Sequence, residues 1–440
     1  MYKYSIKILS IAIILVILLQ CKSHYSTDSN EVDIENAPID VSQLKATRIT
    51  PILDAKINTG ENLIYCSTFQ ITWNSLYKDI YKGETIEIEN APNYIKTLNS
   101  LINEPCNISE DSYVALAGFV KDGIVDKINE KLKGKFAFPI YIQNQMSVIL
   151  FSYFYKEIIF EYEFEKNKVI PHYFYFGTES VSIETFGGIF VRNVPSIYTN
   201  NSNSDIFKNH SLFLPQIRLI YANELGEPPN LFCDYFPHGF IIELISKSKD
   251  EEIIISSIKP DVTLLKSYES ISNVIQDIES NKMIRNKYGK YPLASELIKC
   301  LGNCDGVSTQ EIESQIKTNY YLLLNPRGFI HLFVPKIKFN IINALQILNQ
   351  NNKTSQYNVI ESHNINFNFC GKGIQKNKYI SVNTMTGTYD TNLNLIGPFI
   401  IYIRKKSSAT PYFMAYIGNA ELLIKSDLNY DDFMKNYNKE

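Results

Sequence analysis

The sequence has little tryptophan, cysteine and histidine, and no large excess of charge of either sign. It contains one Trp and seven Cys among 440 residues, too little cysteine for a disulfide-dense scaffold. Lys and Arg number 43 against 46 Asp and Glu, a formal net charge of -3 that provides no positive field for a phosphate backbone. We therefore expect no nucleic-acid partner.

The common sequence signatures of enzymes are also missing. No Gly-x-Ser-x-Gly elbow, His-Glu-x-x-His pair or phosphate-binding Gly-x4-Gly-Lys-Ser/Thr loop occurs in the chain. The six His residues are scattered, and none lies at helical spacing from another. We expect no catalytic residue, no metal site and no cofactor. An enzyme whose distant residues converge in the fold is kept as the third hypothesis.

What the sequence does contain is typical of a folded protein. Hydrophobic residues make up 45% and charged residues 20% of the chain, close to the average for soluble globular domains. Helical and strand-like patterns are mixed without the regular alternation of a doubly wound parallel sheet. We predict a single large domain of mixed α/β (α+β) class over residues 44–423, followed by a charged C-terminal tail at 424–440.

The periodicity of apolar residues predicts the elements of this domain. Helices are expected at residues 62–81, 93–102, 122–132 and 262–279, and strands within 147–176, at 240–244 and at 252–258. From residue 320 onward strands dominate.

The N-terminus has the pattern of a secretory signal peptide. Lys3 and Lys7 precede an unbroken apolar run from Ile11 to Leu19. This run is well short of the about 20 apolar residues that a membrane-spanning helix needs. Residues 1–20 are therefore predicted to be a signal peptide.

The end of the apolar run resembles the lipobox of bacterial lipoproteins. It reads Leu18-Leu19-Gln20-Cys21, with Gln20 where the family has a small residue. The resemblance implies that Cys21 is acylated and holds the protein on the bacterial cell envelope, on the outer-membrane or cell-surface side. Residues 21–43, polar and without apolar periodicity, would then be a flexible linker. The alternative is an ordinary secretory peptide with a chance cysteine.

Cys300 and Cys304 are the only close pair of cysteines. The intervening Gly302-Asn303 is a turn signal that could bring the two sulfurs together in an oxidising compartment. This pair is a possible disulfide, whereas zinc would need two further ligands and no His lies nearby in sequence.

The C-terminal segment resembles the terminal hairpin of the serpin family. Pro398-Phe399 opens an apolar run that ends at Arg404, and a polar turn leads to Phe413-Met414-Ala415 and then Asn419. Further segments at 62–76, 152–164, 330–340 and 382–388 fit serpin patterns in the family's order. The resemblance implies a serpin-like fold of three β-sheets with eight or nine helices, including a helix-like stretch after residue 340 that reaches Asn349.

The same resemblance places the base of the reactive loop at Gly387-Thr388. In inhibitory serpins a long loop with an Ala-rich hinge is cleaved and then inserts as a strand into the central sheet. Here Tyr389 and Asp390 replace the small hinge residues, and only nine residues lie between Thr388 and Pro398. The shortened reactive-loop region comprises Gly387, Thr388, Tyr389, Asp390, Thr391, Asn392, Leu393 and Asn394.

These features favour a surface-anchored bacterial lipoprotein whose serpin-like domain is a non-inhibitory binding or structural module. The expected partners are a membrane, reached through the N-terminal lipid, and a protein such as a protease or a host protein. A protease inhibitor of the serpin family is the alternative hypothesis.

Acylation of Cys21 is directly testable. Cells that express the wild-type chain should incorporate a palmitate analogue into the protein, and Cys21→Ala should abolish both the label and membrane attachment. Absence of label in the wild type, or unchanged membrane binding of the variant, would show that the lipid anchor does not exist.

Overall fold

The computed structural model describes a set of separate stretches that all belong to one compact unit beginning at Pro38. The described residues are 38–86, 92–102, 104, 106–132, 145–166, 171–191, 217–222, 239–280, 329–349, 358–375 and 391–428.

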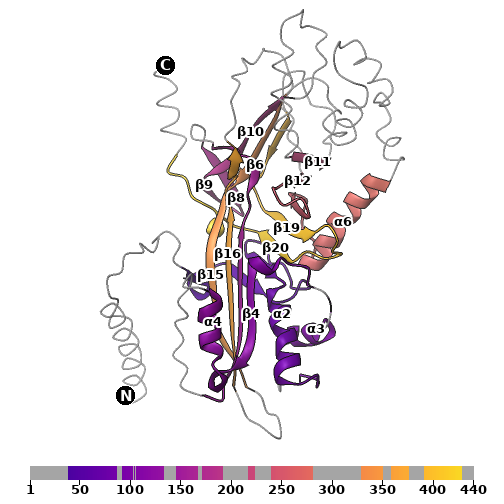
Figure 1. Cartoon of the computed structure of the whole chain (residues 1–440). Helices are drawn as coiled ribbons and strands as arrows, with labels where there is room; N and C mark the ends of the chain where they lie inside the picture. The colour runs from indigo at the N-terminus through magenta and orange to yellow at the C-terminus, as the bar shows by residue number, and fades with distance from the viewer. Residues whose placement is uncertain are drawn as a thin grey trace, which may run out of the picture. The chain divides into compact units, whose positions relative to one another are not determined.

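The longest strands form a five-stranded mixed sheet, which we call the central sheet (Figure 1). Its two middle strands, β16 and β5, run parallel, while β15 and β4 pair antiparallel on either side of them. In sheet order the strands are β1 (Ile39–Asp40), β15 (Ile337–Asn349), β16 (Asn358–Phe369), β5 (Val148–Glu157) and β4 (Tyr113–Phe119).

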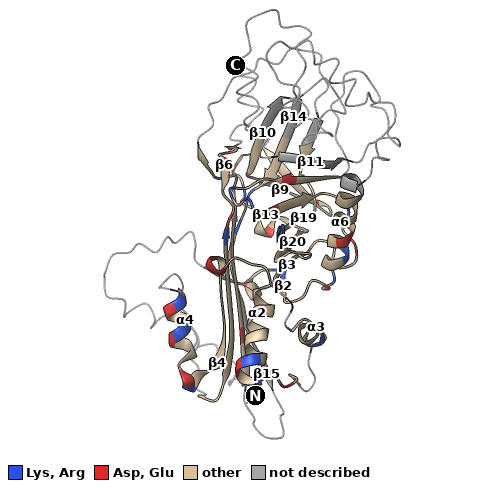
Figure 2. Cartoon of the chain, turned by 45° about the vertical axis from the view of Figure 1, so that its right-hand side comes forward, with Lys and Arg blue, Asp and Glu red and all other residues tan. Residues whose placement is uncertain are grey.

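Strand β5 is covered on both faces, which explains its continuous apolar sequence. Ile149 and Phe151 point to one face and pack against helix α4 (Ile124–Leu132). Val148 and Leu150 point to the other face and pack in the cluster of helix α2 (Thr68–Ser75). The two helices thus cover opposite faces of the central sheet, and α4 carries acidic and basic residues at its exposed positions (Figure 2).

A seven-stranded sheet contains the C-terminal hairpin. One of its faces is covered by helix α6 (Leu264–Ser280), whose Tyr268 and Ile271 pack against Ile400 and Tyr402. In sheet order the strands are β11 (Ile217–Ala222), β12 (Phe240–Leu244), β13 (Glu251–Ser256), β19 (Phe399–Lys405), β20 (Phe413–Ile417), β3 (Asn62–Cys66) and β2 (Thr47–Thr50).

Three further sheets complete the described architecture. A four-stranded sheet has the order β18 (Thr391–Asn394), β14 (Phe329–Pro335), β10 (Thr185–Val191) and β7 (Glu165–Lys166). Two-stranded pairs join β17 (Gly373–Gln375) to β6 (Phe160–Tyr162) and β8 (His172–Phe176) to β9 (Glu179–Ile183).

Most predicted elements are found. Helix α3 (Tyr94–Ser100), helix α4 and helix α6 coincide with periodic segments, and β12 and β13 form the predicted strands. The C-terminal segment is an antiparallel hairpin, in which Phe399 pairs with Ile417. The mixed α/β class with several sheets is therefore confirmed.

Two predicted helices are wrong in part. Within 62–81 the first five residues form strand β3, which pairs with β20, and only then follow α2 and a π-helical turn, Leu76–Ile80. The predicted helix-like stretch up to Asn349 is the second half of β15. Short apolar runs fit a strand and a helix equally well, and pairing with another strand decided both cases: β3 pairs with the distant β20, and the second half of β15 pairs with β16, the next strand in the chain.

The predicted number of helices is also wrong for the part of the chain that the structure describes. That part contains four α-helices, not eight or nine, and five sheets, of which three are large. Ordered pairing begins inside the predicted linker, because Ile39 and Asp40 pair with β15.

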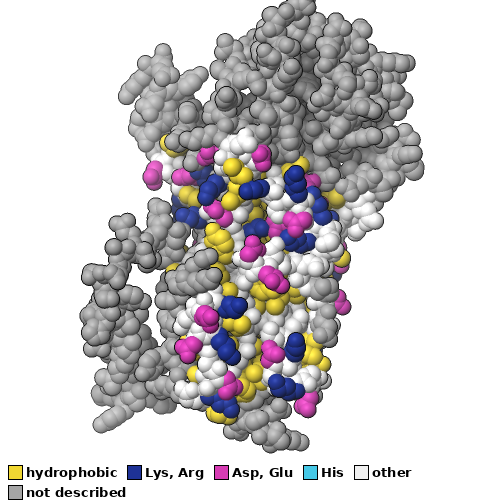
Figure 3. Space-filling model, in the orientation of Figure 1, with side chains coloured by type: hydrophobic (Ala, Val, Ile, Leu, Met, Phe, Trp, Pro, Cys, Tyr) yellow, Lys and Arg dark blue, Asp and Glu magenta, His cyan; other side chains and the backbone are white. Residues whose placement is uncertain are grey.

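The described surface carries both charge signs. On the face shown in Figure 3, basic and acidic side chains are interspersed, and neither forms a large continuous patch among the described residues. None of the helices in the described ranges is long and apolar enough to cross a membrane.

Replacement of Asn62 tests how much its buried side-chain hydrogen bonds stabilise the seven-stranded sheet. Its buried amide donates to Thr47 Oγ1 at 3.1 Å and to Asn419 Oδ1 at 2.8 Å, and its Oδ1 accepts from the backbone N–H of Gly418. Asn62→Leu should lower the free energy of unfolding by about 3 kcal/mol, because it leaves buried polar groups unpaired. The matched control Asn58→Leu removes one half-buried bond and should cost about 1 kcal/mol. Equal urea midpoints for the two variants would contradict this role.

Candidate functional site

The parallel junction between β5 and β16, which we call the seam, lies in the middle of the central sheet. It runs without a break from Val148↔Val359 to Glu157↔Asn368. At its middle, Ser152 Oγ and His363 Nδ1 lie 2.8 Å apart, and Asn364 Nδ2 donates to the Ser152 carbonyl at 3.1 Å. Burial lowers the pKa of His363, which favours the neutral imidazole in this contact.

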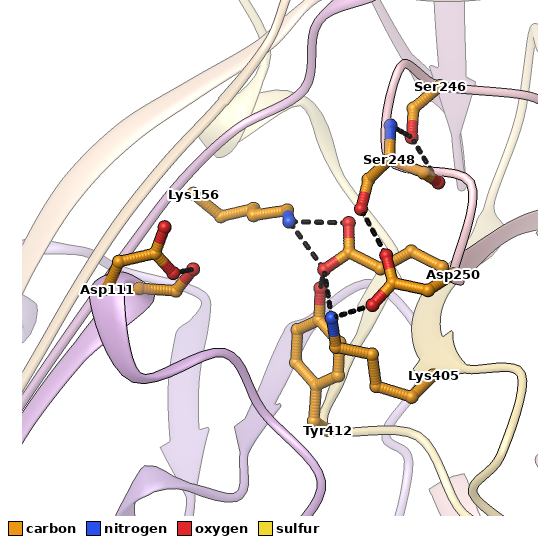
Figure 4. A network of polar contacts seen from close by, with 9 residues as sticks. Asp111, Lys156, Ser246, Ser248, Asp250, Lys405 and Tyr412 are labelled. Carbon is orange, nitrogen blue, oxygen red and sulfur yellow. Dashed lines mark hydrogen bonds and ion pairs between the residues drawn. The ribbon is translucent and has the colours of Figure 1, made fainter.

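The end of β5 is tied to the seven-stranded sheet by a buried ionic network (Figure 4). Lys156 Nζ lies 2.6 Å from Glu251 Oε2, and the Tyr412 hydroxyl donates to Glu251 Oε1 at 2.7 Å. Lys405 Nζ lies 3.8 Å from the same carboxylate and also binds Asp250, whose pKa it helps to lower to about 2. Every charged group in this network has a partner of opposite charge, so none is left to act on a ligand. We interpret the network as a link between the central sheet and the seven-stranded sheet.

The chain that leaves β16 is fixed as soon as the strand ends. Gly371 turns it with a φ of 72°. A Cβ at this position would lie 2.6 Å from the ring of Phe186, so only glycine fits both the turn and the close approach. The Gly371 carbonyl then accepts from the Phe164 N–H at 2.9 Å.

The next residues continue as strand β17 beside β6. Gly373 pairs with Phe160 and Gln375 with Tyr162, while Lys372 Nζ lies 3.0 Å from Glu157 Oε1 at the end of β5. The segment that follows β16 therefore lies just beyond the seam and is hydrogen-bonded to β6, which begins three residues after β5 ends.

The structure places half of the predicted reactive-loop region in a sheet. Thr391, Asn392, Leu393 and Asn394 form β18, which pairs parallel to β14, and Leu393 is buried. Gly387, Thr388, Tyr389 and Asp390 lie outside the described residues.

This placement changes the length of the connection. The strand next to β5 ends at Phe369, so the chain between the central sheet and β18 comprises residues 370–390. The nine-residue stretch 389–397, which suggested a shortened loop from the sequence alone, is much shorter than this connection.

The remaining predicted residues are not brought together by the described structure. Cys21, Cys300 and Cys304 lie outside the described residues. Cys66, Cys106 and Cys370 are free thiols, and burial raises the pKa of Cys66 to about 12. No group of three metal-ligating side chains occurs in the described ranges.

Sequence reasoning missed the polar groups of the seam and of the network. Ser152 and His363 are 211 positions apart, and Lys156 and Glu251 are 95 apart, so no local motif joins them. The one local sequence signal in this region is Gly371-Lys372-Gly373, whose two glycines indicate the turn that follows β16.

Comparisons with known proteins give the following. No protein-family model and no curated protein matches the chain. Similar solved structures include a tumour-suppressing serpin, with 12% identity, a TM-score of 0.36, and coverage of 81% of this chain and 92% of that one. Thyroxine-binding globulin in complex with thyroxine is 11% identical, with a TM-score of 0.37 and coverage of 82% of this chain and 93% of that one. Human glycosylated kallistatin is 9% identical, with a TM-score of 0.36 and coverage of 82% of this chain and 92% of that one. Identities and TM-scores at this level do not establish membership of a family.

Replacement of Gly371 tests whether the turn after β16 is sterically fixed. Gly371→Ala should lower the melting temperature by several degrees, since the new methyl group meets Phe186 in addition to the strain of a positive φ. Gly60→Ala is a matched control, because Gly60 has a φ of 81° but open space around its Cβ position. Equal losses in the two variants would show that the contact with Phe186 is unimportant.

Proposed function

We propose that this protein is a lipid-anchored bacterial surface protein whose serpin-like domain is a non-inhibitory binding or structural module. The observation that carries the proposal is the attachment of residues 371–375 outside the seam. In inhibitory serpins the corresponding chain enters the central sheet after cleavage.

Insertion would first require the seam to open. The backbone pairing from Val148 to Glu157 would be lost, together with the Ser152–His363 contact. The pairing of β17 with β6 would also have to break before the chain could turn back along β16. These losses come before any new pairing forms, so they raise the barrier to insertion.

The side chains that would enter are unsuited to the interior of the sheet. The chain after β17 begins Lys376-Asn377-Lys378-Tyr379, and Tyr389 and Asp390 stand where the resemblance to inhibitory serpins places small residues. Both faces of β5 are covered, by α4 and by the cluster around α2, so alternate residues of an inserted strand would be buried. Burial of an unpaired ammonium group costs several kcal/mol, which opposes insertion.

The anchor at Cys21 would set where this module acts. Residues 22–37 would connect the lipid to the first described residue and let the domain stand away from the membrane. The partner that the module binds would be a protein in the surroundings of the cell, of which a protease or a host protein is the expected class.

The inhibitory alternative predicts a covalent product. We expect no complex resistant to denaturing electrophoresis when the protein is mixed with trypsin-like, chymotrypsin-like and subtilisin-like proteases over a range of ratios. Cleavage within 376–390 should release an active protease. A stable adduct with any of them would overturn the non-inhibitory proposal, and an authentic inhibitory serpin in parallel reactions verifies the assay.

A further inference from the structure

A cavity of about 210 Å³ lies beside the seam, on the face that α2 covers. It lies between the central sheet, β2, β3 and the first turns of α2 and α3. Its polar lining includes Thr50, Tyr94, Ser152, Glu361 and His363. A buried water needs roughly 10–15 Å³ on this measure, so the space is large enough for an organic molecule of several heavy atoms.

The central feature of the cavity is a buried carboxylate. Glu361 is 3% exposed, and its Oε1 has no hydrogen-bond partner among the described residues. Its other oxygen lies 3.5 Å from the Tyr94 hydroxyl and 3.9 Å from His363 Nε2, which itself lacks a hydrogen-bond partner. The negative charge thus has only weak, neutral neighbours.

The nearest cation of the lining does not neutralise this carboxylate. Arg48 lies at the exposed edge of the cavity, but its Nε is 2.8 Å from Glu61 and its Nη2 donates to the Lys56 carbonyl. The imidazole of His363 has its pKa lowered by burial and uses Nδ1 for Ser152. A buried carboxylate without a compensating charge is costly, and a cation from outside the chain would offset this cost.

The lining also has an apolar and aromatic part. Ile49, Pro51, Phe69 and Ile365 contribute to it. Phe69 packs edge-on against His363, with ring centroids 3.8 Å apart. Such a surface fits a short hydrocarbon stem, and the aromatic rings add favourable cation–π contacts to an ammonium group.

We propose that this cavity binds a small organic cation, a primary amine with a short apolar stem, through Glu361. A bare metal ion is a poorer occupant, because the described residues offer no group of three metal-ligating side chains. A neutral molecule would leave the carboxylate uncompensated. The proposal depends neither on the lipid anchor nor on the absence of protease inhibition.

Binding should be visible as a ligand-specific rise in thermal stability of the full chain. Benzylamine should raise the melting temperature saturably, whereas benzyl alcohol of the same shape should bind at least about tenfold more weakly. Ligand-observed NMR on the wild type gives the same comparison without a variant. Equal binding of the amine and the alcohol, or no saturable binding of either because water fills the cavity, would overturn the proposal.

Two variants test whether the amine binds at Glu361. Glu361→Gln should reduce benzylamine affinity at least about tenfold, while Glu179→Gln, which changes an exposed carboxylate on β9, should leave it unchanged. If Glu361→Gln does not fold, Ile49→Trp at the edge of the cavity tests the same site by filling it. Unchanged benzylamine binding in a folded Glu361→Gln or Ile49→Trp protein would contradict the assignment.

Discussion

The parallel pairing of β5 with β16 is the interaction on which the rest of the described structure depends. It joins two segments more than 200 positions apart and brings both faces of β5 into apolar surroundings. Parallel strands need long connections, and here the connection between β5 and β16 supplies helix α6 and many strands of the other sheets. Helices α2 and α4 precede β5 in the chain and pack on β4 and β5.

The seam is also held at the carboxyl-terminal end of its two strands and at its middle. The network around Glu251 ties the end of β5 to the seven-stranded sheet, and the turn at Gly371 directs the chain away from β16 onto β6. Polar groups sit at its centre, where Ser152 meets His363. The combination explains how a sheet with a parallel central pair remains closed and leaves a polar cavity beside it.

Much of this architecture is readable from the sequence, and the rest is not, for physical reasons. Amphipathic helices such as α4 and α6 show their period locally, and the C-terminal hairpin combines two apolar runs with a polar turn. Strand β3 is recognisable only through β20, a partner far away in the chain, and the second half of β15 only through its pairing with β16. The cavity at Glu361 has no sequence signal at all, because its lining comes from seven elements.

The state of the seam after cleavage tests the account most directly. The chain is cut once between residues 376 and 390, and amide hydrogen exchange of β5 and β16 is measured together with the melting temperature. The account predicts that both the protection of these strands and the melting temperature stay close to those of the intact protein. A large rise in melting temperature, with new protection in the cleaved segment, would mean that the segment had entered the seam and would contradict it.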